Sequence, residues 1–200
     1  MADKNYGIMF VKNYLGVLWP RERLTVGWDI LPNEKSMESF FIIYQYSDDI
    51  SVPEFRGLQL IFELILHDEH PIKPPSIKFH TPTGRVKPGE RICIKGLTAY
   101  HPEEWVGKTP PTISSLIDRM LCIFIDLEAI TAEAVGFIAS TPKQYVAFSA
   151  ASAEWNAKHF PDLVASWMLK RAEMTRPAAA APAALPTSID EDFVYSSDDE

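Results

Sequence analysis

Cysteine is scarce in this 200-residue sequence, which contains only Cys93 and Cys122. Two cysteines are too few for a disulfide framework or a cysteine-rich zinc site, and such free thiols are typical of a reducing compartment. Long hydrophobic runs are also missing, since no uncharged apolar stretch approaches the roughly 18 residues that a membrane span needs. Charges at Asp3, Lys4 and Lys12 interrupt the apolar segment that a signal peptide requires. We therefore expect a cytoplasmic or nuclear protein without a membrane span.

Basic residues are absent from the end of the chain. Residues 177–200 include six acids and no lysine or arginine, so they carry most of the net charge of −8. The rest of the chain is close to neutral and offers no basic surface for nucleic acid. Residues 177–186 are rich in alanine and proline, which predicts a linker, and the acidic residues after them predict a disordered tail. We expect one folded domain over residues 1–176 and this linker and tail over 177–200.

The first half of the chain has the periodicity of strands. A short amphipathic helix is expected over residues 3–18 and ends at Pro20. Four strand-like runs, rich in aromatic and β-branched residues, then follow at 24–31, 40–46, 57–66 and 77–80. Short turns separate these runs, which is typical of an antiparallel meander. We expect an N-terminal helix and a sheet of about four strands.

After Trp105 the periodicity becomes helical. Thr109-Pro110 is a favourable helix start, because proline at the first helical position loses no N–H group that the helix needs. Further helices are expected from Thr141-Pro142 and from Pro161. Strands followed by helices predict an α+β fold class. The first of these helices has an apolar face with i, i+3, i+4 spacing, formed by Ile113, Leu116, Ile117, Met120, Leu121 and Phe124.

The two cysteines differ in their surroundings. Cys122 lies within the apolar helix 113–124, and we interpret it as a core residue. Cys93 follows a charged loop with glycine and proline, residues 87–91, and precedes Lys95-Gly96. We expect Cys93 near the surface and close to cations, where a thiolate is favoured, and only the thiolate is a competent nucleophile. These surroundings alone leave Cys93 either a nucleophile or a small buried hydrophobe.

Several short motifs surround Cys93 in a fixed order. Together they resemble the core of a ubiquitin-conjugating enzyme, with its YPxxPPxxxF pattern upstream of the cysteine and a tryptophan turn downstream. The resemblance is strongest to the J-type branch, which carries TPNGR before its cysteine and DFHPxxW after it, and it covers roughly residues 6–167. The motifs are Pro71-Ile72-Lys73-Pro74-Pro75, Ile77-Lys78-Phe79, Thr81-Pro82, Gly84-Arg85, Arg91-Ile92-Cys93-Ile94 and His101-Pro102 followed by Trp105.

This resemblance implies a UBC-like fold and a transthiolation enzyme. Cys93 would accept ubiquitin or a ubiquitin-like protein as a thioester from the activating enzyme. It would then pass the modifier to a substrate lysine or hydroxyl, with a RING-type ligase as partner. No metal or organic cofactor is implied, because the activating enzyme uses the ATP. Ile72, Pro110 and Pro111 stand where the family contacts its ligases, although a proline-rich loop is also simply a rigid connector.

The sequence departs from the family beside the cysteine. Thr83 stands where the J-type branch carries asparagine, so Thr83 is the candidate for oxyanion or loop support. The J-type branch carries an acidic residue before Phe-His-Pro, and this sequence has Thr98-Ala99-Tyr100 in that place. His101 is a candidate polariser of the thioester, and the alternative is a histidine of the turn before Pro102. Loss of one oxyanion donor costs on the order of 10²-fold in rate, so we expect slow transfer to lysine and less affected loading.

Two other functions stay open. One is a catalytically weak or inactive scaffold of the same fold that binds ubiquitin, and the other is a cysteine hydrolase that uses Cys93 and His101. Trp105 is interpreted as a packing residue. An acidic tail stands where J-type relatives carry a membrane anchor, and it either docks on a basic ligase groove or is simply solvated. The remaining histidines show no metal-ligand spacing and are interpreted as surface or strand residues: His67, His70, His80 and His159.

Overall fold

The computed structural model describes residues 12–22, 26–36, 38–94, 96–98, 105, 112–128 and 134–175. Its N-terminal part contains a π-helical turn, η1 (Tyr14–Leu18), followed by a short helix, α2 (Trp19–Glu22). The prediction that Pro20 ends the N-terminal helix is wrong, since Pro20 lies inside α2. The helical residues run without a break from 12 to 22, and Pro20 follows a π-type turn in which the Trp19 N–H group donates to the Tyr14 carbonyl. Prolines and π-type turns both interrupt the regular helical hydrogen-bond pattern.

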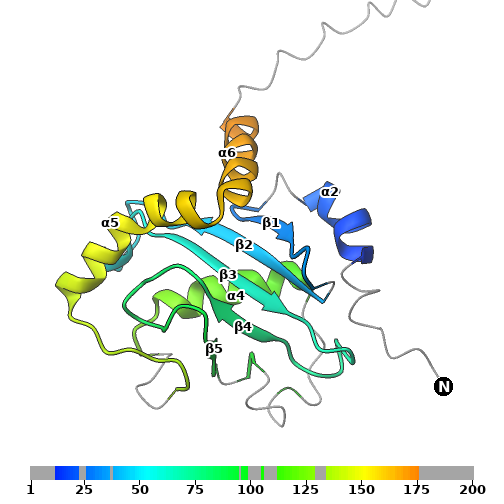
Figure 1. Cartoon of the computed structure of the whole chain (residues 1–200), viewed down its shortest axis with the longest axis horizontal. Coiled ribbons are helices and arrows are strands. Elements are labelled where there is room, and N and C mark those ends of the chain that lie inside the picture. The colour runs from blue at the N-terminus through cyan, green and yellow to red at the C-terminus, as the bar shows by residue number, and fades with distance from the viewer. Residues whose placement is uncertain are drawn as a thin grey trace, which may run out of the picture.

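Five antiparallel strands form one sheet, in which each strand pairs with its neighbour in the sequence (Figure 1). This confirms the predicted meander, with one more strand than expected. The last strand has only two residues, which is too short to show an alternating pattern. The strands are β1 (Asp29–Pro32), β2 (Ser39–Gln45), β3 (Gln59–Ile65), β4 (Ser76–Phe79) and β5 (Arg91–Ile92), with a 3-10 turn, η2 (Pro53–Phe55), between β2 and β3.

The first strand begins later than the sequence predicted. Residues 26–28 are not part of the sheet, and β1 starts at Asp29. It also includes Pro32, which lies one residue beyond the predicted strand 24–31. A proline fits at this place because β1 is an edge strand that pairs only with β2.

Among the described residues after the sheet, three helices have defined bounds: α4 (Ile113–Ile125), α5 (Pro142–His159) and α6 (Pro161–Thr175). The cap of α4 is Thr112, whose side chain accepts a hydrogen bond from the Ser115 N–H group, so this helix starts later than the predicted Thr109-Pro110. The cap of α5 is Thr141, as expected, and it forms a capping box with Gln144. Pro161 begins α6, which confirms the helix predicted from Pro161.

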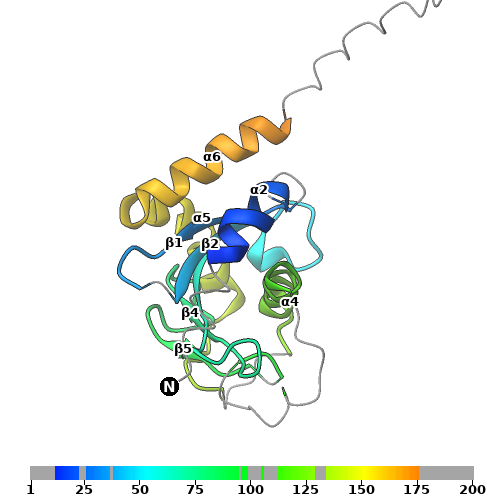
Figure 2. The ribbon, with the colours of Figure 1, turned by 90° about the vertical axis from the view of Figure 1, so that its right-hand side faces the viewer.

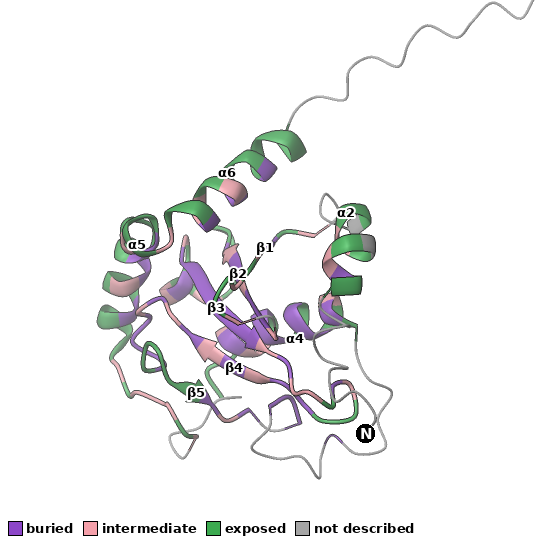
Figure 3. Cartoon of the chain, turned by 45° about the vertical axis from the view of Figure 1, so that its right-hand side comes forward, coloured by how far each residue is buried: buried purple, intermediate pink, exposed green. Residues whose placement is uncertain are grey.

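The sheet separates two apolar clusters. Figure 2 shows α4 on one side of the sheet and α6 on the other, and Figure 3 shows the buried residues concentrated in the strands and on the inner faces of the helices. On the second side Ile43 and Ile61 pack with Leu163 and Trp167 of α6. Alternation along each strand therefore decides which helix a side chain meets. The strand residues that pack with α4 include Phe40, Ile42, Leu60, Phe62, Leu64, Ile77 and Phe79.

The apolar face predicted for α4 is confirmed, because all six of its predicted residues are buried. The prediction that Cys122 belongs to the core is wrong, since Cys122 is exposed. Cys122 stands nine positions after Ile113, and at about 100° per residue this places it opposite the buried stripe. The apolar composition of the helix concealed that difference.

Side chains of α5 and of Thr81, which follows β4, form hydrogen bonds with the backbone of the part of β3 that β4 does not pair with. β4 pairs with β3 only from Phe62 onward. At Gln59 the N–H group donates to Ser152 Oγ at 2.9 Å, and the carbonyl accepts from Asn156 Nδ2 at 2.8 Å. At Ile61 the N–H group donates to Thr81 Oγ1 at 2.8 Å. The backbone of β3 is thus hydrogen-bonded where the neighbouring strand is missing.

Candidate functional site

Cys93 follows β5 directly, and its backbone is held on both sides. Ile92 pairs with Ile77 of β4, and the Cys93 N–H group donates to the carbonyl of Val135 at 3.3 Å. Ile92 and Ile94 are both buried, whereas Cys93 is half-buried. The predicted position of Cys93 near the surface is therefore confirmed.

A tight turn fixes the chain after Cys93. The N–H groups of Leu97 and Thr98 donate to the Ile94 carbonyl at 3.1 and 3.0 Å. The hydroxyl of Thr98 accepts from the Ile94 N–H group at 2.9 Å and is itself buried. Three cations were expected near Cys93. Lys87 is exposed, Arg91 is exposed on the same side of the strand as Cys93, and Lys95 lies outside the described residues.

Thr83 lies in a buried loop, not on an open surface. It is 1% exposed, and its hydroxyl accepts from the Arg85 N–H group at 3.2 Å. Gly84 has φ +72°, and a Cβ atom there would lie 2.7 Å from the ring of Phe148. Ser140 Oγ donates to the Gly84 carbonyl at 2.6 Å, so residues before and within α5 hold this loop. The geometry is that of loop support, and an oxyanion role for Thr83 stays a prediction.

Arg85 is a buried cation that the sequence analysis included only as part of a motif. It is 1% exposed, and its guanidinium donates to the carbonyl of Asp126 and lies 5.8 Å from the ring centre of Phe124. Burial lowers the pKa of Arg85 below its usual value, although Asp126 acts in the opposite direction. The contact fastens the loop before Cys93 to the C-terminal end of α4. The Gly84-Arg85 motif was the only signal of it in the sequence.

Residues 135–138, which we call the 135–138 turn, connect the two segments described above. The Lys87 N–H group donates to the Gly136 carbonyl at 2.8 Å, and the Ile138 N–H group donates to the Arg85 carbonyl at 2.9 Å. Val86 and Phe137 form an isolated antiparallel bridge. The Cys93 N–H group also donates to the Val135 carbonyl. The turn is therefore hydrogen-bonded both to the loop before β5 and to Cys93, the residue directly after β5.

The other predicted site residues lie farther along the chain. Ile72 is 76% exposed, as expected for a contact residue. Trp105 is buried and donates from Nε1 to the Pro71 carbonyl at 3.0 Å, which agrees with its interpretation as a packing residue. His101, Pro110 and Pro111 lie outside the described residues, so their predicted roles stay predictions.

His70 does not fit its predicted surface position. It is 1% exposed and lies 6.4 Å from the Trp105 ring, centre to centre. Burial lowers the pKa of His70, while its hydrogen bond to the Lys73 carbonyl acts in the opposite direction. The interpretation of His70 as a surface or strand residue is therefore wrong, because the turn that carries it packs against Trp105.

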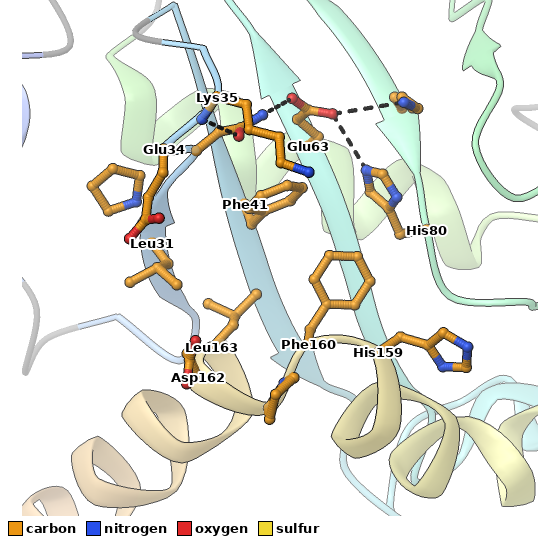
Figure 4. Close-up of a pocket in the computed structure, with 14 residues that line it drawn as sticks. Leu31, Glu34, Lys35, Phe41, Glu63, His80, His159, Phe160, Asp162 and Leu163 are labelled. Atoms are coloured by element: carbon orange, nitrogen blue, oxygen red, sulfur yellow. Dashed lines mark hydrogen bonds and ion pairs between the residues drawn. The ribbon is translucent and has the colours of Figure 1, made fainter.

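A separate cavity of about 420 Å³ lies on the face of the sheet that α4 does not cover, and Cys93 does not line it (Figure 4). At its polar end Glu63 accepts hydrogen bonds from Ser39 Oγ at 2.6 Å, Asn33 Nδ2 at 2.8 Å and His80 Nε2 at 3.3 Å. Burial raises the pKa of Glu63, but these hydrogen bonds outweigh it and lower the pKa to about 2. No local sequence pattern indicated this cluster.

Neither a metal site nor a membrane-spanning helix is found among the residues that the structure describes. Within those ranges no group of three or more histidine, cysteine, aspartate or glutamate residues could hold a metal ion. No described helix is both long and apolar enough to cross a membrane. The predicted domain end, linker and tail at residues 176–200 lie outside the description and stay predictions.

Curated proteins similar to this chain are ubiquitin-conjugating enzymes. Ubiquitin-conjugating enzyme E2 6 of Debaryomyces hansenii is 32% identical over 104 residues, which are 48% of this chain and 40% of that protein. Ubiquitin-conjugating enzyme E2 J2-like of Dictyostelium discoideum is 32% identical over 97 residues, or 48% of this chain and 53% of that protein. The chain thus spans about half the length of these relatives or less. No protein-family model matches it.

Solved structures give weaker likenesses. A structure titled "Novel Ubiquitin-Conjugating Enzyme" aligns with 84% of this chain and 98% of its own at 18% identity and a TM-score of 0.44. Human ubiquitin-conjugating enzyme E2 G1 aligns with 56% of this chain and 95% of its own at 19% identity and a TM-score of 0.39. The stronger likeness is therefore to the curated sequences: the chain is similar to ubiquitin-conjugating enzymes, among them a J2-like one.

Proposed function

We propose that this chain is a ubiquitin-conjugating enzyme that carries ubiquitin or a ubiquitin-like protein as a thioester on Cys93. The observation that supports this most is the placement of Cys93, a half-buried thiol whose backbone is fixed by β5, by the 135–138 turn and by the turn at Ile94. A rigidly held nucleophile at the surface can meet a large protein substrate without rearrangement of the core. The similarity to named conjugating enzymes supplies the reaction class.

The proposed reaction has two acyl transfers. The Cys93 thiolate attacks the thioester carbonyl of ubiquitin on the activating enzyme, a new Cys93 Sγ–C bond forms, and the thiolate of the activating enzyme leaves. A substrate amine or hydroxyl then attacks the new thioester, loses its proton to solvent or a nearby base, and displaces the Cys93 thiolate. A thioester retains enough transfer energy that positioning and oxyanion stabilisation supply the remaining catalysis. These steps require no cofactor on this chain.

The residues around Cys93 have supporting roles in this proposal. The buried hydroxyl of Thr83 maintains the loop that Arg85 ties to α4. His101 is proposed as a polariser of the thioester. Because Thr83 replaces an amide, transfer to lysine is expected to be slower than loading.

Thioester formation tests the proposal directly. Purified protein is incubated with ubiquitin-activating enzyme, ATP and ubiquitin, and a non-reducing gel is run beside a reducing one. We expect an adduct that thiols remove and that Cys93→Ala abolishes. Cys122→Ser is the matched control, because Cys122 is exposed on α4, and it should load normally. No adduct with retained ubiquitin binding would instead support the scaffold function, and cleavage of a ubiquitin conjugate without activating enzyme would support a hydrolase.

A RING-type ligase is the proposed partner at Ile72, with Pro110 and Pro111 as further contacts. Ile72 is 76% exposed, and an exposed apolar side chain on a short loop is suited to a pocket of a partner. Ile72→Ala should reduce ligase-stimulated discharge of ubiquitin at least tenfold and leave loading unchanged. Val146→Ala is the control, since Val146 is also exposed but lies on α5. Equal effects of the two variants would remove Ile72 from the interface.

A further inference from the structure

The two-residue strand β5 has support on two sides. Arg91 and Ile92 pair with Lys78 and Ile77 of β4. On the other side lies the 135–138 turn, which accepts the Cys93 N–H group through Val135. A strand this short has little stability from its own ladder, so the position of Cys93 depends on what packs against the second side.

Gly136 is the residue of the turn that approaches β5. Its φ is +82°, and a Cβ atom built there would lie 3.0 Å from the Arg91 carbonyl oxygen and 3.8 Å from Ile92 Cα. Both atoms are backbone, so they cannot move aside as a flexible side chain would. Any side chain at this position must shift either the turn or the strand that carries Cys93.

We propose that Gly136 is a positioning residue for Cys93. The hydrogen at its Cα allows the turn to approach Arg91 and Ile92 closely, and this approach brings the Val135 carbonyl to the Cys93 N–H group. The catalytic consequence depends on the proposed thioester function, whereas the effect on the thiol does not. A contact of 3.0 Å requires a shift of a few tenths of an ångström. A displacement of about 1 Å at a reacting group can cost 10²-fold in rate, so we expect this smaller shift to cost correspondingly less.

Gly89 provides a matched control for the conformational part of a substitution. Its φ is +81°, close to that of Gly136, but a Cβ atom at Gly89 would have nothing within 4 Å. Alanine at either position therefore carries the cost of a left-handed backbone, and only alanine at Gly136 meets β5. The difference between Gly136→Ala and Gly89→Ala isolates the contact with the Cys93 strand.

The experiment measures Cys93 with and without ubiquitin. All variants carry Cys122→Ser, so that alkylation by iodoacetamide reports Cys93 alone, and the alkylation rate is followed from pH 6 to pH 10. We expect Gly136→Ala to change the alkylation rate at least threefold, with a shift in its apparent pKa, and to slow thioester loading at least tenfold. Gly89→Ala should remain within about twofold of the parent in both measurements.

The alkylation data separate this inference from the proposed function. If the parent takes neither ubiquitin nor a ubiquitin-like protein while Gly136→Ala alone changes alkylation, the conjugating function fails and the positioning role stands. If Gly136→Ala and Gly89→Ala alkylate and load alike, Gly136 has no positioning role. Should Gly136→Ala fail to fold, Gly136→Asn replaces it, because asparagine tolerates a left-handed backbone and still presents a Cβ atom to Arg91.

Discussion

Glu63 should make the stability of the protein depend on pH. Its side chain is only 9% exposed, and three donors hold its pKa at about 2, against an ordinary value of 4.5. The folded state thus holds the proton less tightly than the unfolded state does. The stabilisation is fully present above about pH 4.5 and is lost as the pH falls towards 2. A shift of this size corresponds to about 3 kcal/mol of unfolding free energy, of which about 2 kcal/mol is lost by pH 3.

The measurement is urea unfolding at pH 7, 5, 4 and 3 for the parent and for Glu63→Gln. Glutamine keeps the shape but cannot ionise, so the parent should lose about 2 kcal/mol more than Glu63→Gln between pH 7 and pH 3. Glu90→Gln is the control, because Glu90 is an exposed carboxylate that should leave the pH dependence unchanged. Parallel pH curves for the parent and Glu63→Gln would refute the reasoning.

Three further substitutions test the packing near the site. Arg85→Met should lower the unfolding free energy by about 1.5–3 kcal/mol, because the loop before Cys93 loses the charge-assisted hydrogen bond from the buried guanidinium to the Asp126 carbonyl. Thermal unfolding measures this, and a loss below about 1 kcal/mol would contradict it. Thr141→Ala should cost about 1 kcal/mol by removing the cap of α5, and an unchanged urea midpoint would show that the capping box is not stabilising. Trp105→Phe should lower the unfolding free energy by about 1 kcal/mol, because the hydrogen bond to the Pro71 carbonyl is lost. Faster hydrogen exchange near residue 71 is the measurement, and unchanged exchange would count against this contact.

Periodic patterns predicted those parts of the fold in which neighbours along the chain determine the structure. The helix face of α4 was predicted in full, because the apolar residues at i, i+3 and i+4 become buried together. The same reasoning failed for Cys122, since composition was used in place of its angle on the helix. Strand β5 escaped notice because two residues show no period.

Contacts between distant parts of the chain could not be predicted in this way. Glu63 meets Asn33 and His80 only after three strands align, and no local pattern records that alignment. The bond from Arg85 to Asp126 likewise joins residues 41 positions apart. The position of Cys93 after the loop was predictable from motifs, but the role of Gly136 in holding it required the structure.

The side chains of α5 along β3 have a consequence for how the protein behaves at high concentration. An unpaired strand segment is a template on which another chain can add a strand, and this leads to aggregation. Here Ser152 and Asn156 occupy the donor and acceptor groups of Gln59, so this part of the sheet offers no such template. The side chains of α5 therefore satisfy the backbone groups that a neighbouring strand would otherwise pair with, and another chain cannot add a strand there.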